Sequence, residues 1–221
     1  MPDEGLRERK RRRTRAAIAE AAMRLFLARG FDQVSVAEIA EIAEIAEAAE
    51  VAEKTVYNYF PTKGELFFDE GADLLAELLH AVGTRAPGVS ALEAVRGHVA
   101  GLAEWAAHRR AVRPTPEFRA LIAASPALQA AQRQMFARYE SALAELLARE
   151  TGAAPGSVEP FVVSVALVAA LRAPFEATAG GAEATRHDAA AALELLGAGL
   201  GDYATAPLPP QAAPVGTEHH P

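Results

Sequence analysis

The sequence predicts an all-α protein. Apolar residues recur at helical spacing along the 221 residues, alanine is abundant, and no alternating run of Val, Ile and Thr typical of a strand occurs. Because 51% of the residues are hydrophobic, the chain can form one or two helical domains with a real core. The absence of cysteine excludes disulfides and thiolate metal sites and fits a reducing cytoplasm.

Four helices are expected in the N-terminal part of the chain, after a disordered arm over residues 1–8. Gly30 is suited to the C-cap of the first helix, and Ser35 to the N-cap of the second. Pro61 stops the third helix, and Thr62 can cap the fourth. The expected ranges are about 9–29, 35–48, 52–59 and 62–82.

The remainder is predicted to be helical as well, divided by proline and glycine clusters. Pro87-Gly88 closes the fourth helix, and Pro174 should kink or end a later one. The most apolar run, from Phe161 to Leu171, is too short to span a membrane and contains Ser164. Further helices are expected over about 90–108, 118–122, 128–152, 157–178 and 184–203, before a Pro-rich tail, 205–221, that should be disordered.

The net charge of −7 argues against a nucleic-acid partner, but the charge is unevenly distributed. A basic run near the N-terminus is usually a solvated tail and is weak evidence by itself. Ahead of a DNA-reading helix, such a run would follow phosphates or enter the minor groove. The run consists of Arg7, Arg9, Lys10, Arg11, Arg12, Arg13 and Arg15 against Glu8, and Arg11, Arg12 and Arg13 are the candidate contacts.

The stretch from Val51 to Leu66 carries the main functional signal. Val56 and Phe60 lie four residues apart, so they can anchor a short helix whose other face carries hydroxyl, amide and aromatic groups. Lys63 is unfavourable at a helix N-terminus unless it binds a phosphate together with the free N–H groups there. This pattern predicts a DNA-reading helix, and a hairpin that packs its tyrosines is the alternative. The candidate contacts are Lys54, Thr55, Tyr57, Asn58, Tyr59 and Lys63.

At these residues the chain resembles the tetracycline-repressor (TetR) family of helix-turn-helix regulators. The residues from Ile45 to Leu66 follow the family pattern in register, with Thr55-Val56-Tyr57 and Thr62-Lys63 at matching positions. The first helix also fits, through the stripe Ile18, Ala22, Leu25 and Phe26, followed by Gly30-Phe31. The resemblance is specific over about residues 10–70.

The resemblance implies a cytoplasmic transcriptional regulator, most often a repressor, that binds an inverted-repeat operator in double-stranded DNA as a homodimer. It implies a DNA-binding domain over about 9–66 and an effector-binding and dimerisation domain over about 67–204. Effector binding would tilt the fourth helix and release the operator. Thr55 and Tyr57 are expected near base edges, and Lys54, Tyr59 and Lys63 near phosphates; Ser35 is a further candidate contact. No catalytic spacing, metal site or cofactor motif occurs, although a helical enzyme using carboxylates stays open.

Two sets of residues in the second domain are assigned to the homodimer and the effector. Small residues in 157–178 and 184–203 allow close helix approach, so these helices should form a four-helix bundle with their symmetry mates. The dimer residues are Phe161, Val165, Val168, Ala169, Leu193, Leu196 and Leu200, although a monomeric core would use the same residues. The pocket candidates for an apolar or amphipathic effector are Trp105, His108, Phe118, Met135, Phe136, Tyr139 and Phe175, with Arg109 and Arg172 for an acidic group; residues of this kind are also typical of cores.

Three departures from the family pattern affect the expected DNA binding. Glu50 replaces a turn glycine and Ala52 replaces an N-cap serine, at about 1 kcal/mol each. The triplet Ala37-Glu38-Ile39 occurs three times in tandem, so Val36 and Ile45 lie nine residues apart where the pattern has three. Six added helical residues amount to about 9 Å and about 240° of rotation. We therefore expect reduced or lost operator affinity; a harmless extension into solvent is the alternative.

Overall fold

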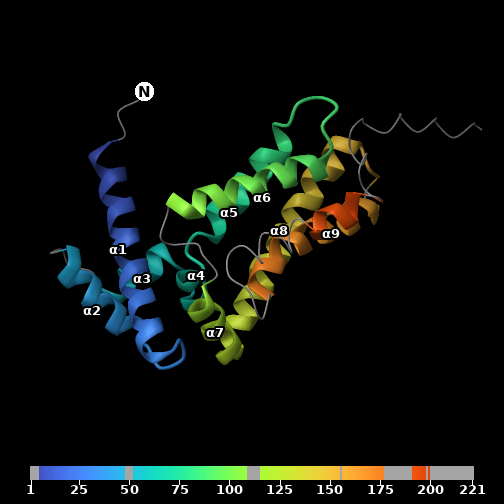
Figure 1. Ribbon diagram of the computed structural model, residues 1–221. Helices are drawn as coiled ribbons and strands as arrows, with labels where there is room; N and C mark the ends of the chain where they lie inside the picture. Colours follow the sequence, from blue (N-terminus) through green and yellow to red (C-terminus); the bar gives the residue numbers. More distant parts are fainter. Residues whose placement is uncertain are drawn as a thin grey trace, which may run out of the picture.

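The computed structural model describes residues 5–47, 52–108, 115–154, 156–176, 191–197 and 199, and every regular element within these ranges is a helix (Figure 1). This confirms the all-α prediction. A further helical segment, 191–197, follows the labelled helices. The labelled helices are α1 (Leu6–Arg29), α2 (Val36–Glu47), α3 (Glu53–Tyr59), α4 (Lys63–Phe67), α5 (Gly71–Gly83), α6 (Ala91–His108), α7 (Pro116–Ala124), α8 (Pro126–Thr151) and α9 (Glu159–Glu176).

The N-terminal helix is longer than the sequence suggested. It begins at Leu6, so residues 6–8 of the expected arm are helical, and the basic run lies on the first turns of α1. Arginine and lysine are good helix formers, which is why the run does not delay the start of the helix. Residues 1–4 and the tail over 205–221 lie outside the described residues, as does much of the expected helix over 184–203.

The expected helix over 62–82 is divided into α4 and α5 by a turn at residues 68–70. Phe67 is buried in the core formed by the N-terminal helices, whereas Phe68 packs against both that core and a second one. Two neighbouring phenylalanines on a continuous helix would point about 100° apart, and the turn lets each reach its own set of partners. Pro174 is included in α9, so it does not end that helix at its own position.

Two hydrophobic cores hold the helices together, and α8 contributes to both. The first core joins α1 to α4 and also takes in Ile122 of α7 and Leu128 of α8. The second core joins α5, α6, α8 and α9 with Leu193. The expected domain boundary near residue 66 therefore does not separate the cores, because α7 and the start of α8 pack on the N-terminal helices (Figure 1).

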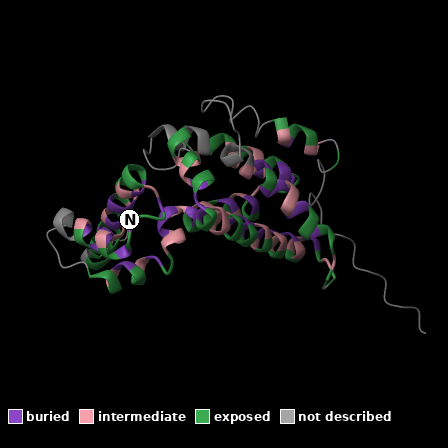
Figure 2. Cartoon of the chain, turned by 90° about the horizontal axis from the view of Figure 1, so that it is seen from below, coloured by how far each residue is buried: buried purple, intermediate pink, exposed green. Residues whose placement is uncertain are grey.

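The buried faces of the described helices point toward these two cores, and the outer faces are exposed (Figure 2). Each of the described helices is too short or too polar to cross a lipid bilayer. In Figure 1, α1, α2 and α3 lie at one end of the molecule, and α9 lies at the other end with the later part of α8.

Candidate nucleic-acid interface and effector domain

The short helix α3 is anchored through one face. Val56 and Phe60 are buried, as their spacing predicted, and the backbone N–H of Phe60 donates to the Val56 carbonyl at the end of the helix. The opposite face presents exposed Lys54, Tyr57 and Asn58. Thr55 and Tyr59 are half-buried, and Tyr59 packs against the first core. The polar side chains expected on a DNA-reading helix are therefore gathered on its accessible side.

The N-terminus of α2 is closed by a reciprocal capping box between Ser35 and Glu38. The Ser35 hydroxyl accepts from the Glu38 N–H (3.2 Å), and a Glu38 carboxylate oxygen accepts from the Ser35 N–H (2.8 Å). Arg29 adds an ion pair with Glu38 at 2.6 Å. The Ser35 N–H, the Arg29 guanidinium and the Ser35 hydroxyl lower the pKa of Glu38 to about 2. Ser35 thus serves as a helix cap in this structure, in addition to being a candidate DNA contact.

Lys63 is turned into the N-terminal core, which differs from the exposed position expected of a phosphate ligand. Its ammonium donates to the Phe31 carbonyl and lies 4.2 Å from the ring centroid of Phe31 and 5.6 Å from that of Phe26. Burial lowers the pKa of Lys63, and the nearby acids Asp32 and Glu38 oppose this effect. Aromatic faces and a carbonyl oxygen can hold the ammonium group of a lysine, as a phosphate can. The position of a lysine in the sequence does not show which of these partners it has.

The basic run divides between solvent and protein. Arg11, Arg12 and Arg13 are exposed on the first turns of α1. Arg15 lies one helical turn after Arg11 and contacts the rest of the protein: its guanidinium donates to the Asp69 carbonyl and lies 4.8 Å from the ring centroid of Phe60. Residues four apart share a face of a helix, so Arg11 and Arg15 differ because of where the other elements reach along α1. Asp69 and Phe60 lie beside the turn that carries Arg15.

The triplet repeats of α2 pack against α1. Ile39, Ala40 and Ala43 are buried in the first core, and Ile42 is half-buried at its edge. Glu41 lies on the exposed side. The side chain of Ile45 and the turn containing Glu50 lie outside the described residues. The first two triplets are therefore part of the N-terminal core and do not extend freely into solvent.

The residues expected to form an effector pocket are divided between the two cores. Met135, Phe136 and Tyr139 are buried in the second core, where the Tyr139 hydroxyl donates to the Gly71 carbonyl at 2.5 Å and burial raises the pKa of Tyr139. Phe118 belongs to the first core instead, because α7 packs on the N-terminal helices. Its ring stacks on that of Phe67 at a centroid distance of 4.5 Å.

The remaining pocket candidates are less fully described. Arg172 pairs with Glu140 at 3.0 Å and lies 5.0 Å from the ring centroid of Phe136. The side chains of Trp105, His108 and Phe175, and all of Arg109, lie outside the described residues. Of the expected pocket residues, the structure therefore brings together Met135, Phe136, Tyr139 and Arg172, and separates Phe118 from them.

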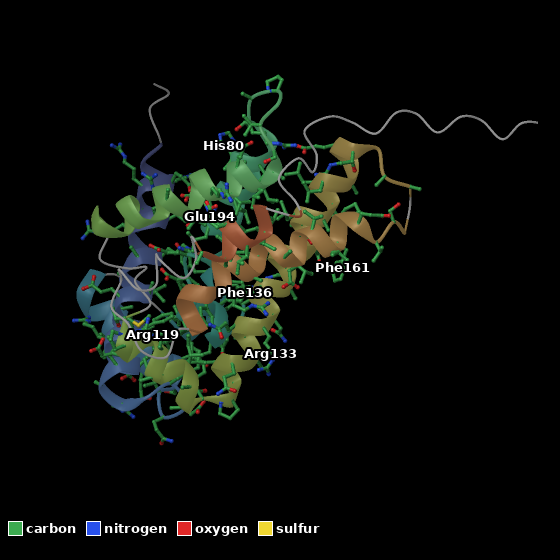
Figure 3. All side chains as sticks on the ribbon, turned by 45° about the vertical axis from the view of Figure 1, so that its right-hand side comes forward. His80, Arg119, Arg133, Phe136, Phe161 and Glu194 are labelled. Atoms are coloured by element: carbon green, nitrogen blue, oxygen red, sulfur yellow. The ribbon has the colours of Figure 1, made fainter. Side chains whose placement is uncertain are left out.

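The expected dimer residues also divide into two groups. Val168 and Leu193 were expected at the dimer interface; in this structure both are buried within a single chain and belong to the second core. Leu196 is half-buried against the same core, and Leu200 lies outside the described residues. A stripe on α9 carries exposed Phe161 and Ala169 with half-buried Val165 between them, and Phe161 points outward (Figure 3). Sequence reasoning missed Val158, Val162 and Leu195, which are exposed by 61%, 54% and 81%.

Comparison with known proteins agrees with this arrangement. The family described as "MftR C-terminal domain" matches residues 89–201, which is more than half of the chain, and "Bacterial regulatory proteins, tetR family" matches residues 41–69. A crystal structure from Mesorhizobium loti, assigned to the TetR family of transcriptional regulators, has the same fold with a TM-score of 0.51 at 20% identity, covering 84% of this chain and 96% of that one. No curated protein matches the chain significantly.

TetR-family proteins bind DNA operators and small-molecule effectors and act as dimers. The N-terminal match includes all of α3 and α4, and the C-terminal match covers α6 to α9. By its sequence matches and its fold, the chain belongs to the TetR family of bacterial transcriptional regulators.

Proposed function

We propose that this regulator is a homodimer that binds an inverted-repeat operator through α3 and is released from it by an apolar or amphipathic small molecule. The orientation of α3 carries the proposal: Val56 and Phe60 fix one face in the core, while Lys54, Tyr57 and Asn58 are accessible on the other. A helix held in this way can enter the major groove with its free face toward the bases. Repression is the usual outcome of such binding in the family.

We assign Thr55 and Tyr57 to base edges, and Lys54, Tyr59 and the exposed arginines of α1 to phosphates. Gel-shift titrations of the DNA upstream of the protein's own gene, against a mixed-sequence duplex, test these roles. Arg11→Ala should weaken binding to both duplexes and reduce the salt slope by about 0.9 per lost phosphate contact. Tyr57→Ala should change the preference between duplexes. If Tyr57→Ala weakens both duplexes equally, α3 does not read sequence.

Lys63 and Ser35 can contact phosphate only in addition to, or in exchange for, their present partners. For Lys63, a phosphate would replace the Phe31 carbonyl. We therefore expect Lys63→Ala to lower both the DNA affinity and the melting temperature of the free protein. A loss of affinity without any change in melting temperature would show that the Phe31 contact has no structural role.

The homodimer is proposed to form through the stripe of α9 that carries Phe161, and exposed Leu195 of the last helical segment is a further candidate. Phe161 and Leu27 offer a matched pair, because each is 51% exposed, but Leu27 lies on α1, away from the stripe. Phe161→Glu should convert the dimer to a monomer in sedimentation velocity at micromolar concentration, and Leu27→Glu should not. If both variants stay dimeric, the interface lies elsewhere.

The effector is proposed to bind at the second core, where Met135 and Tyr139 lie beside Gly71 at the start of α5. Arg172 could hold an acidic group of the effector only if its guanidinium binds that group and Glu140 at the same time. A thermal-shift screen of apolar and amphipathic compounds should find molecules that stabilise the wild type and the control variant Arg133→Ala, in which an exposed side chain is changed. The same molecules should not stabilise Tyr139→Ala or Trp105→Ala. Equal shifts in all four proteins would move the pocket elsewhere.

The number of triplets is proposed to adjust operator affinity. Ile39, Ala40 and Ala43 hold α2 on α1, so added triplets change how α1 and its basic run are placed relative to α3. The N-terminal family match begins at residue 41, within the repeats, which supports an insertion at this point. Deleting residues 40–45 should increase operator affinity at fixed salt. An unchanged or poorer affinity in the shortened protein would contradict the proposal.

A dimeric effector-binding protein with lost or weakened DNA binding is the second candidate function. It is favoured by one observation: Ala52 caps α3 without any side-chain hydrogen bond, so the reading helix lacks a normal N-terminal cap. Ala52→Ser should restore the cap. If neither the wild type nor Ala52→Ser binds the upstream DNA, this second function is the correct one.

A further inference from the structure

Arg15 differs from the exposed arginines that precede it, because both of its described contacts lie inside the protein. Its guanidinium donates to the backbone carbonyl of Asp69, in the turn between α4 and α5. The same group lies 4.8 Å from the ring centroid of Phe60, the residue that caps the C-terminus of α3. One side chain of α1 therefore contacts both the end of the reading helix and the start of the connection to α5.

The reading helix needs such support. α3 has seven residues, and helices this short are unstable in isolation. Its N-cap residue, Ala52, makes no side-chain hydrogen bond to the helix, so side-chain contacts hold α3 mainly at its C-terminal end. There Phe60 is buried in the first core, and the guanidinium of Arg15 covers its ring. An arginine suits this place because its planar group can stack on a ring while its N–H groups donate to a carbonyl.

The charge of Arg15 also has a local partner. The carboxyl group of Asp69 has a raised pKa, chiefly because it is buried, and Arg15 acts in the opposite direction by favouring the charged form. A guanidinium that is already engaged by a carbonyl, a ring and a nearby acid is poorly placed to neutralise a phosphate.

We propose that Arg15 is a positioning residue for base recognition: it fixes the direction of α3 through Phe60 and does not itself bind DNA. This rests on the proposed DNA-binding function. The competing role, a seventh phosphate contact in the basic run, makes the opposite prediction for lysine. Lysine would keep a phosphate contact, because it has the same charge and a similar reach, but it lacks the flat group that stacks on Phe60.

The test compares Arg15→Lys, Phe60→Leu and their double variant with Arg24→Lys, a matched change at an exposed position of the same helix that is not assigned to DNA. Wild-type protein first selects a duplex from a random pool, and affinities are then measured for that duplex and for a mixed-sequence duplex. Arg15→Lys should reduce the ratio of the two affinities by about threefold to tenfold, the range expected for a partly buried cation–π contact. It should leave the salt slope unchanged. Arg24→Lys should leave both quantities unchanged.

The double variant shows whether Arg15 acts through Phe60. If the ring is its means of action, Arg15→Lys and Phe60→Leu combined should lower the affinity ratio no further than Phe60→Leu alone. Hydrogen exchange of the α3 amides, measured without DNA, should be faster in Arg15→Lys than in Arg24→Lys. If Phe60→Leu folds poorly, this exchange measurement still shows whether Arg15 supports α3.

The outcomes separate the two proposals. An unchanged affinity ratio together with unchanged exchange in α3 would overturn the positioning role of Arg15. Equal weakening of both duplexes by Arg15→Lys, with a smaller salt slope, would make it a phosphate contact and would equally overturn the proposal. If wild-type protein selects no duplex, the proposed DNA-binding function fails, and faster exchange in Arg15→Lys would still support the contact between Arg15 and α3.

Discussion

Replacing Gly64 with alanine should destabilise the protein by forcing α4 away from α8. A methyl group at this position would lie 2.7 Å from the Cβ atom of Ala131. Non-bonded carbon atoms prefer separations of about 3.5–4.0 Å, so the two helices would have to move about 1 Å apart. Because the obstacle is the Cβ atom of an alanine, no change of rotamer can relieve the clash.

The magnitude follows from two opposing effects. Overpacking of a tight contact costs about 1–3 kcal/mol, whereas alanine gains at most about 1 kcal/mol over glycine in a helix. The separation would also disturb the 3.4 Å ion pair of Glu65 with Arg138 across the same boundary, and the stack of Phe67 on Phe118 of the adjoining helix α7. We expect a net loss of about 1–2 kcal/mol in the free energy of unfolding, or about 2–8 °C in melting temperature.

Thermal and urea unfolding, followed by circular dichroism, measures this change. Ala131→Gly is the matched control, because it removes the opposing methyl group at a cost of about 1 kcal/mol in helix propensity. In the double variant the methyl group simply changes sides, so the double variant should be more stable than the sum of the two single changes predicts. The reasoning is refuted if Gly64→Ala is as stable as the wild type, or if the two changes are additive.

Three further predictions concern other contacts. Tyr139→Phe removes the hydroxyl that donates to the Gly71 carbonyl and should cost about 1–2 kcal/mol in urea unfolding; a loss under about 0.5 kcal/mol would show that this bond contributes little. The pKa of Glu38 is lowered from 4.5 to about 2, so its stabilising effect is present above pH 4.5 and is lost as the pH falls toward 2; Glu38→Gln should therefore have the lower melting temperature at pH 6, and the difference should shrink in acid and at high salt. Ser125 both caps α8 and donates to Asp32 at 2.9 Å, so Ser125→Ala should be more destabilising than Asp32→Ala, by about 1 kcal/mol in chemical unfolding, and equal losses would contradict the capping role.

The sequence by itself determined the local structure. Helix caps are short-range features, and Ser35, Thr62 and Gly30 all lie at the helix ends where their side chains or backbone freedom predicted them. The spacing of Val56 and Phe60 correctly identified the buried face of α3. These predictions succeeded because each depends on residues within about one helical turn of one another.

Only the tertiary structure decided which partner covers each apolar face. Val168 and Phe161 both lie on the apolar helix α9, yet Val168 is buried within the chain and Phe161 is half exposed, because α8 and α6 pack on one side of α9. Phe118 joined the first core for the same reason: its partner Phe67 is distant in sequence and is met only when α7 folds back. Periodicity indicates that a face is apolar but carries no information about the helix that will cover it.

Long charged side chains showed the same dependence. Lys63 and Arg15 were both expected to face DNA, and in the structure both lie over aromatic rings and donate to backbone carbonyls. A lysine or arginine stem is long enough to reach either solvent or a nearby ring, so its direction is set by what surrounds it. The residue type fixed the positive charge, and the packing of α1 against α3 and α4 fixed where that charge lies.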